Sequence, residues 1–171
     1  MSNSRATTIS VNLAYCFVAN TRKVLLLDCN INDPHIHECF NIKNDFGLTD
    51  ILEHNDYTNY LKYTKAIKDS YSDNELHVIT AGNERKHPID LLSGQSFKEF
   101  MQLMKSEYDF IIVDCPSLES CSDVIPVSHL VDGTILVVSL PETDKNIAKR
   151  SIERLKRNGA KVLGTVLNKV E

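Results

Sequence analysis

Apolar positions in this chain fall into two kinds of pattern, short continuous runs and helically spaced segments. Two runs share one design, because residues 24–27 lead directly into Asp28 and residues 110–113 lead directly into Asp114. A short apolar run between polar segments is typical of a strand buried on both faces of a parallel sheet. We therefore predict two strands that deliver both carboxylates to the carboxyl edge of one sheet, where open α/β folds bind their ligands.

Helical spacing and further apolar runs alternate along the rest of the chain. Helices or helical turns are predicted over residues 8–20, 34–40, 46–52, 57–67, 96–105, 123–129 and 144–157, and further strands over 76–80, 134–139 and 162–167. Thr7 or Thr8 is available as the N-cap of the first helix, and Gly159 follows the last helix as a C-terminal stop. This alternation predicts a three-layer α/β fold with a mostly parallel sheet and helices on both faces.

Composition narrows the class of protein. At 171 residues we expect a single domain over 1–171, and 42% hydrophobic with 25% charged residues is ordinary for a globular chain rather than a disordered one. The net charge of −4 disfavours a non-specific nucleic-acid surface. No apolar run reaches the roughly 18 residues of a membrane span, and no secretory leader is recognised at Met1. The odd number of cysteines, five without a CxxC pair, indicates reduced thiols in a cytoplasm.

The two strand-end carboxylates have two readings. Asp28 and Asp114 can be polar residues that merely end buried strands, which is a common arrangement. Oxygen ligands at neighbouring strand ends also suit a hydrated Mg²⁺ that holds nucleotide phosphates. The second reading predicts a nucleotide site.

Several motifs occur in the order of one known family. They are LLLDCNINDPHIHECF (25–40), GLTDIL (47–52), HPIDLLSGQSFKEFM (87–101), EYDFIIVDCP (107–116) and the closing HLVDGTILVV…VLGTVLNKV (129–170). Together they resemble the bacterial tyrosine kinases that regulate capsule and exopolysaccharide synthesis, which belong to the deviant Walker class of P-loop ATPases. The resemblance runs from about Asn12 to Lys169. It implies a P-loop NTPase-like fold, Mg²⁺ and ATP or ADP as cofactors, and phosphoryl transfer to tyrosine.

The resemblance also implies a role for particular residues. Asp28 matches the carboxylate that organises Mg²⁺ and helps to activate the attacking hydroxyl, and Asp114 matches the Walker B acid that holds Mg²⁺. Thr7 falls where the P-loop hydroxyl that coordinates Mg²⁺ belongs, with Thr8 beside it as a further nucleotide contact. Asn168 matches the asparagine that reads the adenine edge.

The segment before Asn12 departs from the family pattern. A P-loop needs glycines, whose backbone N–H groups surround the phosphates, and a lysine that reaches the β and γ oxygens. Here the lysine position holds Ala6, the position before it holds Arg5, and the first glycine is Gly47. The family's first strand has no counterpart in the sequence. These departures predict that binding of Mg²⁺ and nucleotide is impaired in this chain.

Two functions follow from these observations. The first is a catalytically impaired relative that acts by association, with the cytoplasmic part of a membrane polysaccharide co-polymerase, a like subunit or further copies of itself as partner. Such a protein would be cytoplasmic, held at the inner face of the membrane through its partner without inserting into the membrane. Its expected docking surface is the tyrosine-rich segment 49–71. The second is an active tyrosine kinase or partitioning-type ATPase of which this chain is a fragment.

Overall fold

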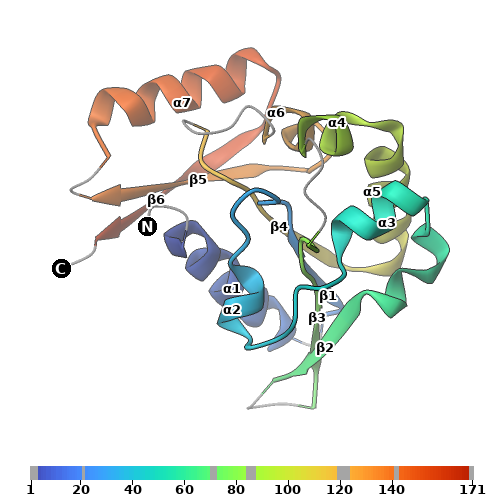
Figure 1. Cartoon of the computed structure of the whole chain (residues 1–171). Helices are drawn as coiled ribbons and strands as arrows, with labels where there is room; N and C mark the ends of the chain where they lie inside the picture. The colour runs from blue at the N-terminus through green and yellow to red at the C-terminus, as the bar shows by residue number, and fades with distance from the viewer. Residues whose placement is uncertain are drawn as a thin grey trace.

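The computed structural model describes residues 4–20, 22–69, 73–83, 88–118, 124–140 and 143–169. Helices and strands alternate through most of it (Figure 1). The elements are α1 (Ser4–Val18), β1 (Val24–Asp28), α2 (Ile36–Cys39), α3 (Leu48–His54), the 3₁₀ helix η1 (Tyr57–Lys62), β2 (Thr64–Lys68), β3 (Glu75–Ile79), α4 (Pro88–Ser93), α5 (Gln95–Glu107), β4 (Phe110–Asp114), α6 (Val124–Ser128), β5 (Thr134–Leu140), α7 (Lys145–Arg157) and β6 (Val162–Lys169). The predicted mostly parallel α/β class is confirmed.

The strands form two sheets rather than the single sheet that the sequence led us to expect. Four strands are ordered β2-β3-β1-β4, and β5 pairs with β6 in a second sheet. The pairs β1–β3, β1–β4 and β5–β6 are parallel, whereas β2 runs antiparallel to β3 at the edge. In the part of the chain that the structure describes, β4 is bonded only to β1 and β5 only to β6.

Strand β1 is the centre of the larger sheet, and all five of its residues are buried. Its side chains alternate between the two faces, as those of any strand do. Leu25 and Leu27 pack into a cluster with Phe97 and Phe100 of α5. On the other face, Leu26 packs in a second cluster with residues of α1. Helices on both faces give the three layers that the sequence predicted.

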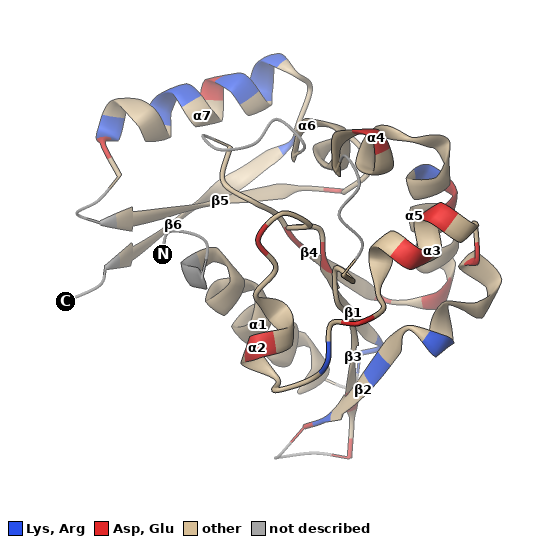
Figure 2. Cartoon of the chain, viewed as in Figure 1, with Lys and Arg blue, Asp and Glu red and all other residues tan. Residues whose placement is uncertain are grey.

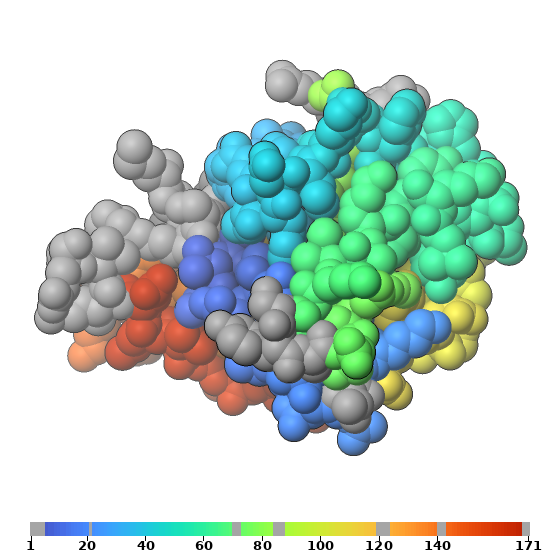
Figure 3. Space-filling view, turned by 90° about the horizontal axis from the view of Figure 1, so that it is seen from below, coloured from blue at the N-terminus to red at the C-terminus, as the bar shows by residue number. Residues whose placement is uncertain are grey.

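Helix α1 lies against both sheets. It contacts β1, β3 and β4 of the larger sheet and β5 of the smaller one. Figure 1 shows this helix below the smaller sheet, and Figure 3, seen from below, shows its blue atoms at the surface next to orange-red atoms of the C-terminal part of the chain. The smaller sheet has its own small cluster, in which Leu155 of α7 packs with Leu118, Val124 and Ala160.

Two local predictions are wrong. Residues 57–67 were expected to be helical, but only Tyr57–Lys62 form a 3₁₀ helix, and Thr64–Lys68 form the antiparallel edge strand β2. Tertiary pairing with β3 decides this short segment, whose own periodicity is poor. Thr7 and Thr8 are also not N-caps, because α1 begins at Ser4 and places both inside the helix.

One close approach requires glycine. The backbone N–H of Leu48 donates to the carbonyl of Thr80 at 2.8 Å. A Cβ atom on Gly47 would lie 2.1 Å from that same carbonyl oxygen. This contact fixes the start of α3 beside the end of β3, at the same carboxyl edge as the two aspartates.

Candidate functional site

Asp28 and Asp114 are neighbours at the carboxyl edge of the larger sheet. They are the last residues of β1 and β4, and the parallel register pairs them directly. The Cys29 N–H donates to the Asp114 carbonyl at 2.9 Å, so the pairing continues past the strand ends. Both side chains are buried, with exposed fractions of 0% for Asp28 and 2% for Asp114. The structure thus places two carboxylates side by side away from water.

Asp28 is held by backbone donors from the loop that follows β1. Its Oδ1 accepts from the Asn30 N–H at 3.0 Å and its Oδ2 from the Ile36 N–H at 3.3 Å. These bonds favour the charged form, but burial and the neighbouring Asp114 act against it more strongly and raise the pKa of Asp28 to about 7. Asp28 therefore titrates near neutral pH, unlike an ordinary aspartate.

Asp114 is held by two hydroxyl groups of α1. Thr7 Oγ1 donates to Asp114 Oδ2 at 2.7 Å, and Ser10 Oγ donates to Oδ1 at 2.9 Å. The two donors lie three residues apart, which puts them on one face of the helix. Burial raises the pKa of Asp114, and the two hydroxyl groups oppose that rise.

The loop after β1 contributes the side-chain amide of Asn30 and the imidazole ring of His35. Asn30 is buried, and among the residues that the structure describes its Oδ1 has no hydrogen-bond partner. His35 lies 3.3 Å from Asp33 and 3.1 Å from Glu38, and the hydrogen bond to Glu38 leads the causes that raise its pKa. Protonated His35 favours the charged forms of both Asp28 and Asp114.

This arrangement fits a divalent cation. Two adjacent buried carboxylates repel each other when both are charged, and a cation between them would remove that repulsion. Mg²⁺ prefers oxygen ligands, and the two carboxylates, the Thr7 hydroxyl and Asn30 Oδ1 are all oxygen ligands. Asp28, Asp114 and Thr7 are the residues that would hold the ion, directly or through water.

The structure brings together three of the five residues singled out from the sequence. Thr7, Asp28 and Asp114 form one cluster, whereas Thr8 is exposed on α1. Asn168 lies opposite Ser139 in the smaller sheet. Among the described residues, no hydrogen bond or ion pair joins Asn168 to either aspartate.

Sequence reasoning missed two members of the cluster. Ser10 could have been found from its spacing, because it follows Thr7 by three residues on a predicted helix. Asn30 had no such signal as a partner of Asp28, because its role depends on how the loop after β1 turns back.

Comparison with known proteins agrees with this arrangement. Residues 4–157 match the AAA domain family. The chain belongs to this family. It is 32% identical over 163 residues to the tyrosine-protein kinase YwqD of Bacillus subtilis (strain 168), a match that covers 94% of this chain and 65% of YwqD. The resemblance to bacterial tyrosine kinases is thereby confirmed.

Solved structures give the same result. The kinase domain of VpsO superposes with a TM-score of 0.84 at 29% identity, covering 96% of this chain and 78% of that one. The septum site-determining protein MinD of Pyrococcus horikoshii OT3, complexed with Mg-ADP, shares the fold with a TM-score of 0.71 at 21% identity, over 95% of this chain and 64% of MinD. The fold is that of P-loop NTPases, and nucleotide with Mg²⁺ is a ligand of one such neighbour.

Proposed function

We propose that this AAA-family chain is a catalytically impaired relative of the bacterial tyrosine kinases that acts by association in capsule or exopolysaccharide synthesis. The observation that carries the proposal is a contrast within α1. Its Thr7 keeps the contact to Asp114 at 2.7 Å, but Ala6 stands where a phosphate-binding lysine is needed. In this proposal, Thr7, Asp28 and Asp114 are the half of the site that would hold a metal ion, whereas the half that would hold phosphates lacks its lysine and its glycines.

In this proposal, each residue of the cluster has a different role at the metal site. Asp114 would hold Mg²⁺, with Thr7 as a second oxygen ligand, and Asp28 would orient a water ligand or an incoming hydroxyl. When bound, Mg²⁺ would neutralise negative charge on phosphate oxygens. Ser10 and the Asn30 N–H keep the two carboxylates in place through hydrogen bonds of 2.9 and 3.0 Å.

Phosphoryl transfer would be slow because the groups that bind the phosphate oxygens are missing. Catalysis of this reaction is almost entirely positioning and electrostatic stabilisation of phosphate oxygens. Removal of one stabilising donor from a catalytic site costs about 10²–10³-fold in rate. Loss of the lysine together with the glycine backbone donors should cost more, so that the chain keeps a family site without family activity.

Association is the part of the proposal that concerns partners and location. We propose a cytoplasmic protein whose partner is the cytoplasmic part of a membrane polysaccharide co-polymerase, a like subunit or a second copy of this chain. No helix among the described residues is long and apolar enough to cross a membrane.

The expected tyrosine-rich docking surface needs correction. Tyr60 is buried in the core, where its ring packs edge-on against Tyr108. Tyr57 and Tyr63 are half-buried, and the hydroxyl of Tyr63 donates to Asp56 at 3.1 Å. Tyr71 lies outside the described residues. Among the described residues of this segment, Leu61 is a large apolar side chain that is exposed, with 61% of its area accessible.

A melting experiment separates metal binding from nucleotide binding. The chain is heated with Mg²⁺ alone, with ATP alone and with both, next to Asp114→Asn and a control variant, Asp132→Asn, whose carboxylate is 97% exposed. A ligand at 100 times its dissociation constant stabilises by about 2.7 kcal/mol, which is roughly 5–10 °C for a chain of this size. We expect Mg²⁺ to stabilise the wild type and Asp132→Asn but not Asp114→Asn, with no further gain from ATP.

Transfer itself is measured with γ-labelled ATP. If the purified chain incorporates more label on tyrosine than an Asp28→Asn variant does, the proposal that it is catalytically impaired is wrong. If Mg²⁺ did not change the melting temperature, the proposed metal site would be contradicted. Only the proposal of association with a partner would then remain.

A second candidate is an active tyrosine kinase or partitioning-type ATPase of which this chain is a portion. The observation in its favour is that the chain spans 65% of YwqD while the Thr7–Asp114 contact is intact. If the natural coding sequence upstream supplies a strand and GxxGxGK[ST], the extended protein should bind Mg-ATP and label its own tyrosines. The same upstream sequence without that motif would exclude this candidate.

A further inference from the structure

Helix α7 carries a concentration of positive charge that the acid cluster does not use. Its thirteen residues include six Lys or Arg and one acid, Glu153, so the helix carries +5 while the rest of the chain carries −9 within a total of −4. Figure 2 shows blue segments along α7 at one border of the molecule, whereas red segments mark α2, α3, α4 and α5. The charge of the molecule is therefore strongly asymmetric.

All of these cations face solvent. The exposed ones are Lys145, Lys149, Arg150, Arg154, Lys156 and Arg157. The buried and half-buried positions of α7 are uncharged, and Leu155 alone of them is fully buried. The outer half of the helix is thus a cationic strip about 20 Å long, from thirteen residues at 1.5 Å each.

Few of these charges are neutralised within the protein. Arg157 lies 4.0 Å from Glu153, and Arg154 Nη1 donates to the Leu118 carbonyl at 3.0 Å. Lys145, Lys149 and Lys156 have no carboxylate within ion-pair distance among the described residues. Three lysines on one side of the strip are therefore available to an external anion.

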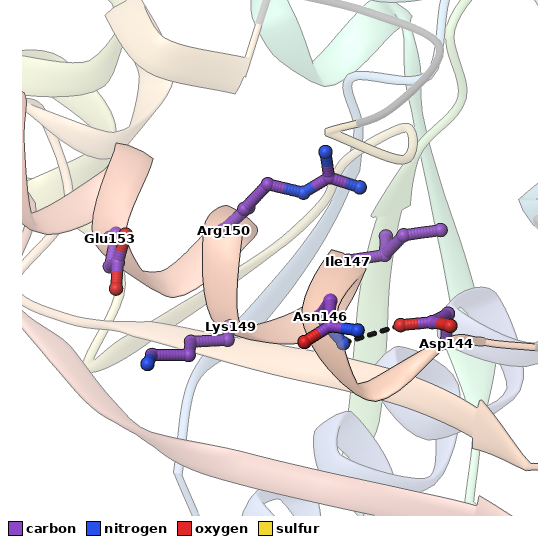
Figure 4. Close-up of a pocket in the computed structure, with 6 residues that line it drawn as sticks. All are labelled: Asp144, Asn146, Ile147, Lys149, Arg150 and Glu153. Carbon is purple, nitrogen blue, oxygen red and sulfur yellow. Dashed lines mark hydrogen bonds between the residues drawn. The ribbon is translucent and has the colours of Figure 1, made fainter.

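The shape of the strip favours a flat partner. A shallow, open depression lies along the N-terminal half of α7, and it is lined by Asp144, Glu153, Lys149 and Arg150 among others. Figure 4 shows Lys149 and Arg150 extending from the helix in different directions rather than converging on one point. Charges of both signs and divergent cations do not form a pocket for one anion, whereas exposed lysines spread along the helix can each contact a separate anion.

We infer that the outer face of α7 docks on an anionic phospholipid surface. Clusters of four to eight Lys or Arg on a helix with one apolar face are attracted to acidic lipid headgroups, by about 1 kcal/mol per residue near the surface. The strip has no large exposed apolar side chain, so the attraction is electrostatic and peripheral. The inference is independent of the metal site and of the proposed loss of catalysis.

The test is co-sedimentation with vesicles. The whole chain is mixed with phosphatidylcholine vesicles containing about 30% phosphatidylserine, or none, at low and at physiological salt. A strip variant changes Lys145, Lys149 and Lys156 to Gln, and a control variant changes Lys62, Lys65 and Lys68, which are equally exposed, to Gln. Both variants lose three charges, and exposed substitutions of this kind shift stability little.

We expect the wild type and the control to bind only the acidic vesicles, less tightly as salt rises. The strip variant should bind about 100-fold more weakly, which corresponds to three residues at roughly five-fold each. Equal loss in both variants, or equal binding to vesicles without phosphatidylserine, would overturn the inference. So would retention of the chain by polyglutamate or duplex DNA at a salt concentration where acidic vesicles do not bind.

Discussion

The two sheets of this molecule differ in how much of them is hidden from water. In the larger sheet, β1 is buried along its whole length between two apolar clusters. In the smaller sheet, Ile135, Leu163 and Leu167 are 41%, 62% and 64% exposed. The carboxylate pair lies in the first environment and the cationic helix in the second. Burial raises the pKa values of the two aspartates, whereas the lysines of α7 are exposed to solvent.

The difference has a structural cause. The larger sheet is covered by α1 and α2 on one face and by α3 and α5 on the other. The smaller sheet has one modest cluster, built around Leu155. Stability should therefore be concentrated around β1, while the β5–β6 region contributes more to recognition than to folding.

The largest effect should come from truncation of the same residue type in the two sheets. Leu27→Ala in β1 should lower the free energy of unfolding by about 2–5 kcal/mol, because it leaves a cavity in a closed core. Leu167→Ala in β6 should change it by less than about 0.5 kcal/mol, because that side chain is 64% exposed. Urea unfolding followed by circular dichroism measures both.

The same experiment tests our proposal that residues 1–171 form one domain. Coincident transitions by circular dichroism and tyrosine fluorescence would support one cooperative unit. If the two substitutions lowered the free energy of unfolding equally, the proposal that the larger sheet contributes more to stability would be wrong.

The second effect concerns the pH dependence of stability. Because the pKa of Asp28 rises from 3.8 unfolded to about 7 folded, the native state binds this proton more tightly. The resulting stabilisation is complete below the unfolded value and is lost as pH rises through 7, by about 2.5 kcal/mol between pH 5 and pH 8. The difference in unfolding free energy between wild type and Asp28→Asn, measured across that range, should show this slope.

Saturating Mg²⁺ should flatten the wild-type slope, since a bound cation favours the charged carboxylate. A parallel pH profile for wild type and Asp28→Asn would mean that Asp28 does not titrate as stated.

A smaller effect is expected from the hydroxyl that joins α1 to β4. Thr7→Val removes the donor to Asp114 Oδ2 and leaves a buried acceptor without its partner, which should cost about 1–3 kcal/mol. Thr7→Ser keeps the hydroxyl, so it should retain most of the stability that Thr7→Val loses. If Thr7→Ser were as unstable as Thr7→Val, the result would count against the cluster.

The smallest effect belongs to the cap of α7. The side chain of Asp144 accepts a hydrogen bond from the Asn146 N–H at 2.6 Å, as an N-cap does. Asp144→Ala should lower stability by about 0.5–2 kcal/mol, and Asp144→Asn by less. Hydrogen exchange of the α7 amides should locate the loss in this helix. Loss of protection in β1 instead would show that the two sheets are coupled more tightly than their packing indicates.

The sequence alone determined the α/β class, the family and the position of every described strand except β2. Continuous apolar runs that end in Asp28 and Asp114 allow few alternatives, because a strand buried on both faces needs apolar residues throughout. The two acids could be placed at one edge for the same reason, since parallel strands share the direction of their carboxyl ends. Helix α7 was predicted over residues 144–157 with Gly159 as its C-terminal stop, and it spans Lys145–Arg157.

Tertiary structure decided the rest. The segment after η1 became an edge strand because β3 offers it backbone partners, which no local pattern reveals. Thr7 contacts Asp114 across 107 positions of sequence, and a contact of that range depends on how α1 packs on β4. The raised pKa of Asp28 has the same origin, because local sequence supplies a carboxylate but only packing removes the water around it.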